Sequence, residues 1–295
     1  HDVHVMVLGQ LDNAVSNSPA SLYLPYNMLY MSARATYTYD NRYTAEVNVG
    51  INGSEQFSKE NRWGIFPAVS VGWTVSEEKF FKDNIDRKWI DFLKIRASYG
   101  IVGNDRLGES RFLYLDDVRV TYNQGYVNNG TVIPSLGRGN YVATSLLGNL
   151  NLKWEKARQQ NYGLDINFLN GFSFNFDYFR EMRDDILVAR STVPLVQGLP
   201  SSVLPRVNMG KVENHGYEMV LGWQKALGKD WFITMSGNYN FARNKVLEAD
   251  EVRLQTGRGG YLYPYRQTGF PIGQTWVLQV DYKDGAGKIG RASGW

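Results

Sequence analysis

The stretch Glu60-Asn-Arg-Trp-Gly-Ile-Phe-Pro-Ala-Val-Ser-Val-Gly-Trp-Thr-Val-Ser-Glu-Glu78 alternates between two kinds of residue from Ala68 onward. Side chains of a β-strand point alternately to its two faces, so the alternation predicts a strand with two unlike faces. One face carries Val69, Val71, Trp73 and Val75, and the other carries Ala68, Ser70, Gly72 and Thr74. The medium that the Val and Trp face meets, a protein core or lipid, decides both fold and function.

The same period of two recurs along most of the chain. It predicts strands at 28–39, 42–51, 93–101, 161–168, 172–178, 217–223 and 231–241. His1–Leu8 is expected to add a further strand, and Trp276–Tyr282 a weaker one. The chain is therefore predicted to be all-β, with about eight or nine strands.

The connections between these strands differ in length on the two sides of the expected sheet. Tight turns are predicted at Asp40-Asn41, Asn170-Gly171 and Lys225–Asp230. The stretch 76–91 is expected to hold a helical turn, with Ser76 as its cap and Glu77 and Glu78 in its first turn. The opposite connections, at 52–64, 102–153, 187–207 and 248–275, are long and rich in Gly, Asn, Pro, Arg and Tyr. Short turns on one side and long loops on the other are typical of outer-membrane barrels.

Aromatic and charged residues favour the same architecture. Aromatic side chains flank each short turn, where a membrane interface would place them: Tyr37, Tyr39, Tyr43, Phe168, Phe172, Trp223 and Trp231. The polar strand faces carry charges in mid-strand: Arg34, Glu46, Lys94, Arg96, Asp165 and Asp177. A polar lumen accommodates such charges. A soluble β-sandwich with aromatic strand ends is the alternative.

Composition narrows the function classes. The net charge of +3 over 295 residues gives no case for a nucleic-acid-binding surface. The absence of cysteine excludes disulfides and thiolate metal sites. No apolar run approaches the length of a membrane-spanning helix. The mean hydropathy of −0.37 is that of a soluble chain, but barrel strands also read as polar because every second residue faces the lumen.

Several stretches in order resemble one family. These are Asp40–Ser54, Asn61–Trp73, Leu93–Asn104, Leu152–Lys156 running into Asn161–Asp165, and Val207–Glu218. Together they cover roughly residues 27–245 and are similar to SusC/RagA-type TonB-dependent outer-membrane transporters. The resemblance implies an antiparallel up-and-down transmembrane β-barrel. This chain would supply part of a plugged barrel of about twenty-two strands.

The resemblance also implies a domain assignment and a function. Residues 1–295 would be part of the receptor β-barrel domain, with the plug domain and the TonB-contact motif absent from this chain. The protein would be a multi-pass barrel in the outer membrane of a Gram-negative bacterium. It would import oligosaccharides or peptides, two substrate classes that share these motifs. Its expected partners are a SusD-like surface lipoprotein, the TonB–ExbB–ExbD complex through parts absent here, and outer-membrane lipid, but no nucleic acid.

No set of residues predicts catalysis. The three histidines, His1, His4 and His215, are scattered, and no nucleophile, P-loop or zinc spacing occurs. Asp281–Gly287 has some oxygen ligands of a calcium loop but lacks its acidic spacing, so a plain turn is favoured. We therefore expect no enzyme, no catalytic, cofactor-binding or metal-binding residue, and no cofactor.

Substrate-binding residues are not assigned. Tyrosines gather in two long connections: Tyr114, Tyr122, Tyr126, Tyr141, Tyr261, Tyr263 and Tyr265. They would stack on sugar rings, contact a surface lid protein, or pack the loops together, and the sequence leaves these three roles open.

Two further function classes stay open: a passive porin-like or adhesin barrel, and a soluble carbohydrate-binding β-sandwich. The sandwich would bury the Val69, Val71 and Trp73 face against a second sheet. In the barrel interpretation Val69, Val71, Trp73 and Val75 face lipid. Trp63 and Phe66 then lie at the outer rim, and Glu77 and Glu78 mark the periplasmic end.

Overall fold

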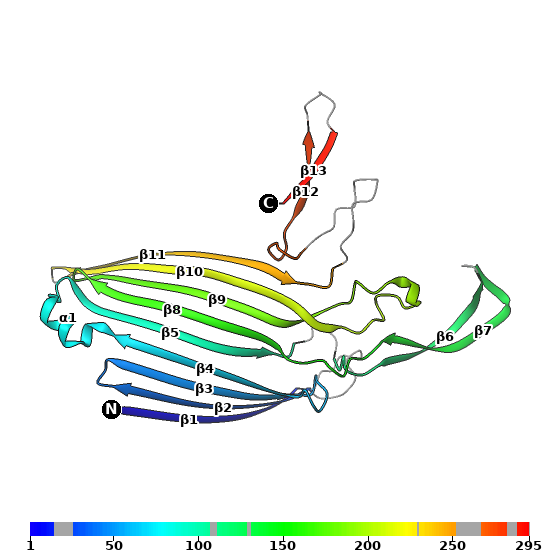
Figure 1. The fold of residues 1–295 in the computed structure, drawn as a ribbon, viewed down its shortest axis with the longest axis horizontal. Helices are drawn as coiled ribbons and strands as arrows, with labels where there is room; N and C mark the ends of the chain where they lie inside the picture. Colours follow the sequence, from blue (N-terminus) through cyan, green and yellow to red (C-terminus); the bar gives the residue numbers. More distant parts are fainter. Residues whose placement is uncertain are drawn as a thin grey trace.

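The computed structural model describes residues 1–14, 26–106, 111–128, 131–228, 230–251, 267–281 and 288–294. Its main element is a nine-stranded antiparallel sheet in the order β1-β2-β3-β4-β5-β8-β9-β10-β11 (Figure 1). The strands are β1 (Asp2–Ala14), β2 (Tyr26–Tyr39), β3 (Tyr43–Ser54), β4 (Trp63–Thr74), β5 (Ile90–Asn104), β8 (Glu155–Phe168), β9 (Phe172–Val188), β10 (Val207–Leu227) and β11 (Trp231–Glu248). The prediction of an up-and-down, partial barrel sheet is confirmed.

The register aligns the apolar faces of all nine strands. Val69 of β4 is opposite Val47 on one side and Tyr99 on the other. The polar residues alternate with them, as where Ser70 opposes Glu46. We call the continuous apolar surface the outer face and the polar surface the inner face. One slipped residue would exchange the two faces of a strand, so this agreement specifies the pairing.

The two ends of the sheet differ as expected. The N-terminus and the short connections lie at one end, which we call the turn end, and the long connections lie at the loop end (Figure 1). Asp40 and Asn41 take φ of 49° and 53°, and Asn170 takes 50°. These left-handed conformations are those of tight hairpin turns, which confirms the turns predicted at Asp40-Asn41 and Asn170-Gly171. The turn predicted at Lys225–Asp230 is shorter than expected, because β10 continues to Leu227.

The β4–β5 connection corrects a detail of the prediction. It holds a 3-10 turn, η2 (Val75–Glu77), and a short helix, α1 (Lys79–Asn84), whose N-cap position is Glu78. A helical turn was expected here, but Ser76 as its cap was wrong, because Ser76 lies inside the 3-10 turn. Val75 was expected to face lipid and is instead buried in that turn.

The long connection predicted at 102–153 lies at the loop end as expected, but it holds strands that were not predicted. Its first residues complete β5, and a hairpin of β6 (Asp117–Asn128) and β7 (Thr131–Leu146) extends beyond the loop end of the sheet (Figure 1). The weaker strand predicted near residue 276 is β12 (Trp276–Asp281). It pairs with β13 (Lys288–Gly294) in a separate two-stranded sheet.

The outer face remains exposed in mid-sheet. Val71 is 57% exposed and Val69 is 47% exposed, which contradicts the soluble-sandwich alternative because that fold would bury them. Within the described part of the chain, every helix is too short or too polar to pass through a bilayer. The buried apolar residues gather instead at the loop end.

Candidate functional site

The outer face has the dimensions of a membrane crossing. On β4, Trp63 and Trp73 lie ten positions apart on this face, and on β11 Trp231 and Phe241 have the same spacing. At a rise of about 3.4 Å per residue and a tilt of about 45°, ten residues cover about 24 Å along the membrane normal. This height matches the apolar band of about 25 Å found on outer-membrane barrels.

Aromatic rings border this apolar band at both ends. At the turn end, Phe168 and Phe172 stack with ring centroids 5.5 Å apart, and Trp223 lies 6.1 Å from Phe172. Farther along the outer face a second row of rings crosses four strands: Tyr162, Tyr178, Tyr217 and Phe241. On β11 this row lies ten positions from the turn-end ring Trp231, but on β8 and β9 it lies six positions from Phe168 and Phe172, in mid-strand. Amphipathic rings settle at the headgroup level of a bilayer, so the rings at the turn end mark one interface, and Trp63 on β4 and Phe241 on β11 mark the other.

The inner face carries an ion cluster in mid-sheet. Arg96 of β5 donates from Nε to Asp165 of β8 at 3.1 Å and from Nη2 to Asp177 of β9 at 2.7 Å. Asn175 donates to the other oxygen of Asp165 at 2.8 Å. The guanidinium thus joins three strands and compensates the charges of two carboxylates. All three groups lie on the inner face, which would line the predicted lumen.

Gly163 makes this geometry possible. It lies opposite Arg96 on one side and Asp177 on the other, so the arginine side chain passes directly over it. A Cβ at Gly163 would lie 2.5 Å from Cζ and 2.6 Å from Nε of Arg96. Arg96, Gly163 and Asp177 thus form one row across β5, β8 and β9, and the central position of this row needs a residue without a side chain.

We expect Gly163→Ala to displace Arg96 from Asp177 and to lower the unfolding free energy by about 1–3 kcal/mol, the usual cost of overpacking. Gly237→Ala is the matched control, because a Cβ at Gly237 has no atom within 4 Å. Urea unfolding of the full-length protein in lipid vesicles measures both variants. Equal effects of the two substitutions would contradict the role given to Gly163.

Glu78 ties the turn end together. Its carboxylate accepts hydrogen bonds from the Tyr43 hydroxyl, from Trp73 Nε1 at 3.1 Å and from Arg42 Nη1 at 3.2 Å. The hydrogen bond from Tyr43 is the main cause that lowers the pKa of Glu78, and those from Trp73 and Arg42 add to it while burial opposes it. Two interfacial rings are thus held against a charged group at the end of the apolar band.

We expect the ionised carboxylate of Glu78 to make its full contribution to stability at any pH above the pKa of an unfolded glutamate, about 4.3. Because the pKa of folded Glu78 is lowered, the contribution is lost as the pH falls through that lowered pKa. Glu78→Gln should lack this acid-dependent loss. Thermal unfolding from pH 7 to pH 3 measures it, and identical pH dependence in the two proteins would contradict it.

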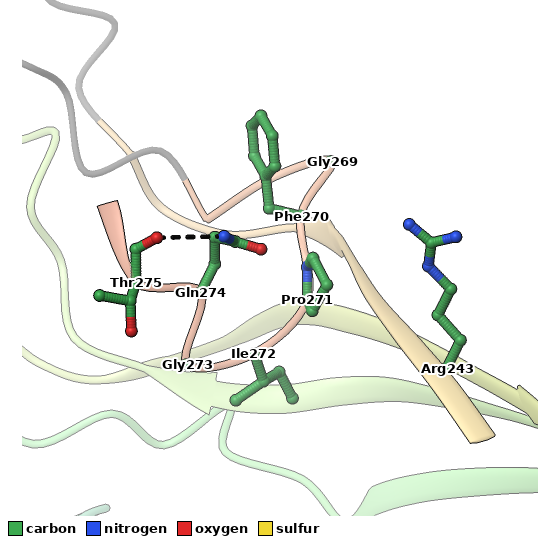
Figure 2. Close-up of a pocket in the computed structure, with 8 residues that line it drawn as sticks. All are labelled: Arg243, Gly269, Phe270, Pro271, Ile272, Gly273, Gln274 and Thr275. Carbon is green, nitrogen blue, oxygen red and sulfur yellow. Dashed lines mark hydrogen bonds between the residues drawn. The ribbon is translucent and has the colours of Figure 1, made fainter. Parts of the chain in front are cut away.

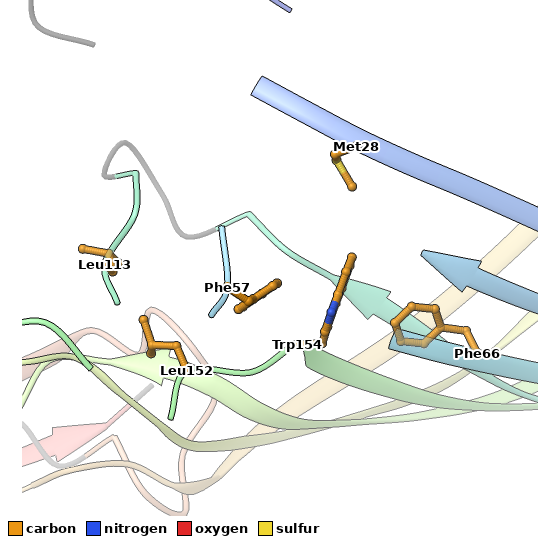
Figure 3. Close-up of a cluster of buried hydrophobic side chains, with 6 residues drawn as sticks. All are labelled: Met28, Phe57, Phe66, Leu113, Leu152 and Trp154. Atoms are coloured by element: carbon orange, nitrogen blue, oxygen red, sulfur yellow. The ribbon is translucent and has the colours of Figure 1, made fainter. Parts of the chain in front are cut away.

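A compact apolar cluster closes the loop end (Figure 3). It joins strands to the segments 55–62, 111–116 and 147–154, and it consists of Met28, Phe57, Phe66, Leu113, Leu152 and Trp154. Trp154 lies 5.2 Å from Phe57 and 5.3 Å from Phe66 between ring centroids, and its Nε1 donates to the Arg62 carbonyl at 3.2 Å. We call this cluster the loop core. Phe66 was expected at the rim, but it is buried here, whereas Trp63 is exposed as expected.

Polar groups, one of them the buried Asp105, join the loops around the loop core. Asp105 accepts from the Tyr26 hydroxyl and from Ser54 Oγ, the latter at 2.7 Å. Asn208 donates to the carbonyls of Lys153 at 2.9 Å and Asp185 at 2.8 Å, so it holds β10 against the start of β8. The loop end is therefore a packed structure that fixes the positions of long connections.

The loop between β9 and β10 is fastened to the end of β11. Asp250 accepts from Ser191 N at 2.7 Å and from Thr192 Oγ1 at 2.5 Å, and Arg190 Nε lies 3.5 Å away. Burial alone would raise the pKa of Asp250, but the hydrogen bonds from Thr192 and Ser191 and the charge of Arg190 bring it below its ordinary value. The carboxylate therefore stays ionised near neutral pH and keeps this loop in place.

A hollow of about 590 Å³ lies where the segment 269–275 passes the loop end of β11. Figure 2 shows the Arg243 side chain on one side of the hollow and the turn of Pro271 and Ile272 on the other. Ile272 N donates to Asn244 Oδ1 at 2.7 Å, which attaches this segment to β11. Residue spacing gave no sign of this hollow, because it forms only when the segment folds back onto the strand.

The model of the TonB-dependent receptor-like β-barrel family matches residues 29–293. The chain belongs to that family. TonB-dependent receptor P39 of Formosa agariphila is 36% identical over 232 residues, which are 78% of this chain and 20% of that protein. TonB-dependent receptor SusC of Bacteroides thetaiotaomicron is 33% identical over 217 residues, 72% of this chain and 20% of SusC. This TonB-dependent receptor chain thus spans about a fifth of the length of these relatives.

Solved structures agree with the receptor fold. A structure of the RagAB peptide importer in an open–open state matches with a TM-score of 0.63 and 25% identity, over 88% of this chain and 26% of that one. A structure of the RagAB peptide transporter has a TM-score of 0.65 at 23% identity over 95% of this chain and 30% of that one, which shows the shared fold. The resemblance to SusC and RagA drawn from the sequence motifs is confirmed.

The residues considered for chemistry in this receptor chain are spread apart. His4 lies on β1 and His215 on β10, and the described residues contain no group of three or more His, Asp or Glu side chains that could hold a metal ion. Tyr114 packs edge to face with Phe112 at 6.3 Å in the loops. Residues 282–287 and three tyrosines, Tyr261, Tyr263 and Tyr265, lie outside the described residues, as do the side chains of Tyr122, Tyr126 and Tyr141. The assignment of no catalytic, cofactor or metal residue stays a prediction.

Proposed function

We propose that the complete protein is an active importer in the bacterial outer membrane, energised by TonB, that takes up oligosaccharides or peptides. The observation that carries the proposal is a membrane-height apolar face on a chain that belongs to the TonB-dependent receptor family. The name SusC and the description of RagAB as a peptide importer belong to relatives, and they supply the two substrate classes considered.

In this proposal the chain supplies part of the barrel wall, and it is not an enzyme. The inner face, with the Arg96 cluster, lines the lumen against the plug domain that we assign to another part of the full-length protein. The plug and the TonB-contact motif transmit the pull of the TonB–ExbB–ExbD complex. The loop core holds the external loops in fixed positions around the mouth of the barrel.

The transport proposal is tested by uptake into cells with and without TonB. We expect deletion of the full-length receptor gene, or of TonB, to abolish growth on one class of substrate offered as the sole source, a defined oligosaccharide or a defined peptide. Uptake that persists without TonB would instead support the passive porin-like alternative. Neighbouring genes for glycoside hydrolases or for peptidases would favour the corresponding substrate class.

We further propose a SusD-like surface lipoprotein as a partner at the loop end. A photo-crosslinking residue at Val142 of the exposed β6–β7 hairpin should capture this lipoprotein on intact cells. The same residue at Phe80, exposed at the turn end, is the matched control and should not capture it. Capture from both positions, or from neither, would contradict a lid on the loop side.

A further inference from the structure

Phe179 of β9 places an aromatic ring on the inner face. It pairs with Asn161 of β8 and Gly216 of β10, one row nearer the loop end than the row of Arg96. A Cβ at Gly216 would lie 2.7 Å from Phe179 Cζ, so the ring reaches across the sheet and lies over the glycine. A ring in this position covers the wall with one side and leaves the other side toward the lumen.

Phe66 shows what a neighbouring ring does to such a side chain. It also lies over a glycine, because a Cβ at Gly64 would be 2.3 Å from Phe66 Cζ. Trp154 covers Phe66, with ring centroids 5.3 Å apart, and leaves it 8% exposed. Phe179 is partly exposed and makes no ring contact with any residue that the structure describes. Its lumen side is therefore open to a ligand.

The side chains around this ring are of the kinds that bind hydroxyl groups. Neighbours on the adjacent strands lie about 4.8 Å away and those two residues along the strand about 6.8 Å away, which is the scale of one sugar ring. Amides donate and accept hydrogen bonds, and carboxylates accept them, so together they can bind both atoms of a hydroxyl. The neighbours on the inner face are Gln159, Asn161, Asp177, Glu181, Asn214 and Glu218.

The charges in this patch favour a neutral ligand. The arginines nearest the ring are already compensated, since Arg96 is paired with Asp177 and Arg183 with Glu181. Glu218 is exposed and forms no ion pair with any residue in the described part of the chain. A peptide or an acidic sugar would bring a carboxylate to a place that offers it no free cation.

We propose that Phe179 is a stacking platform for a neutral oligosaccharide on the lumen wall, with the amides of Asn161, Gln159 and Asn214 and the carboxylate of Glu218 binding its hydroxyls. The C–H groups on one face of a pyranose ring carry a small positive charge, and they pack against the negative face of an aromatic ring. This inference rests on the proposed import function, and it selects neutral oligosaccharides over peptides as the substrate.

The test measures binding to the full-length receptor, purified in detergent, by isothermal titration calorimetry. The probes are short neutral oligosaccharides (α-glucan, β-glucan, mannan, xylan and fructan) and a library of short peptides. We expect a neutral oligosaccharide to bind, and Phe179→Leu to weaken that binding about tenfold, because leucine keeps the apolar bulk but lacks the π-face. Phe179→Tyr keeps the ring face and should restore most of the affinity.

Phe232→Leu is the matched control. Phe232 is also on the inner face, opposite Ala226 near the turn end of β11, and it is 67% exposed. It lies far along the strand from the proposed platform, so this variant should bind the oligosaccharide as the wild type does.

Binding of peptides alone, or of no probe, would overturn the inference. Wild-type affinity in the Phe179→Leu variant, or equal losses in the two leucine variants, would overturn it as well. TonB-dependent uptake of the same probes by cells is measured in parallel. Uptake of peptides alone would overturn this inference and leave the proposed import intact, whereas sugar binding that requires Phe179 but no TonB-dependent uptake would overturn the proposed import alone.

Discussion

Val69→Arg is expected to destabilise the folded protein in a lipid bilayer, lowering its free energy of unfolding by about 2–4 kcal/mol, the cost of an arginine on the lipid face of a barrel near the midplane. Val69 lies near the middle of β4, between Trp63 and Trp73, and 47% of it is exposed on the outer face. Lipid offers no partner for a guanidinium at this depth, so the side chain must deform the bilayer or reach an interface.

Ser70→Arg is the matched control. Ser70 is the next residue on the same strand but faces the inner side, directly opposite Glu46, which can pair with the new charge. Its effect should stay below about 1 kcal/mol. Urea titration of the full-length protein in vesicles, followed by tryptophan fluorescence, measures both variants. A Ser70 variant as damaged as the Val69 variant would contradict the assignment of the two faces.

Trp154→Ala is expected to destabilise the loop core by about 3–5 kcal/mol, the usual range for removing a large buried aromatic side chain. Trp154 is 3% exposed and fills the space between Phe57 and Phe66. Its loss also leaves the Arg62 carbonyl without the indole donor. The segment 55–62 should then separate from the strands that it now covers.

Hydrogen exchange and limited trypsin digestion report this separation, because trypsin would cut after Lys59 and Arg62 once the segment opens. Trp89→Ala, at a side chain 65% exposed at the turn end, is the control and should change stability by no more than about 0.5 kcal/mol. A loop end that stays protected in the Trp154 variant would show that the loop core does not hold the loops.

The strands and their two faces could be predicted from the sequence because they depend on a local period. Val71 and Ser70 occupy opposite faces whatever their neighbours are, and alternation shows this directly. The β6–β7 hairpin could not be predicted from alternation, for a physical reason. Its pairing shifts register after Asp117, between Thr121 and Gln124, and again after Gly125, so the period of two is interrupted.

Features that depend on contacts distant in the sequence could not be predicted. Phe66 is buried because Trp154 covers it, and the residues next to Phe66 in the sequence give no sign of this contact. The N-cap position of α1 is occupied by Glu78 rather than Ser76. The Tyr43 and Trp73 side chains, which come from two strands, donate hydrogen bonds to the Glu78 carboxylate. The charges Arg96 and Asp177 were assigned to the polar face, but their pairing requires the register of three strands.

The row of Arg96, Gly163 and Asp177 has a consequence for how the strands find one another. Alternation penalises a displacement by one residue, but a displacement by two leaves the apolar faces matched. If β8 shifted by two, Asn161 or Asp165 would take the place of Gly163 opposite Arg96. A side chain would then occupy the path that the guanidinium follows to β9. A glycine in mid-strand thus distinguishes the native alignment from its nearest competitors, which the hydrophobic pattern alone does not separate.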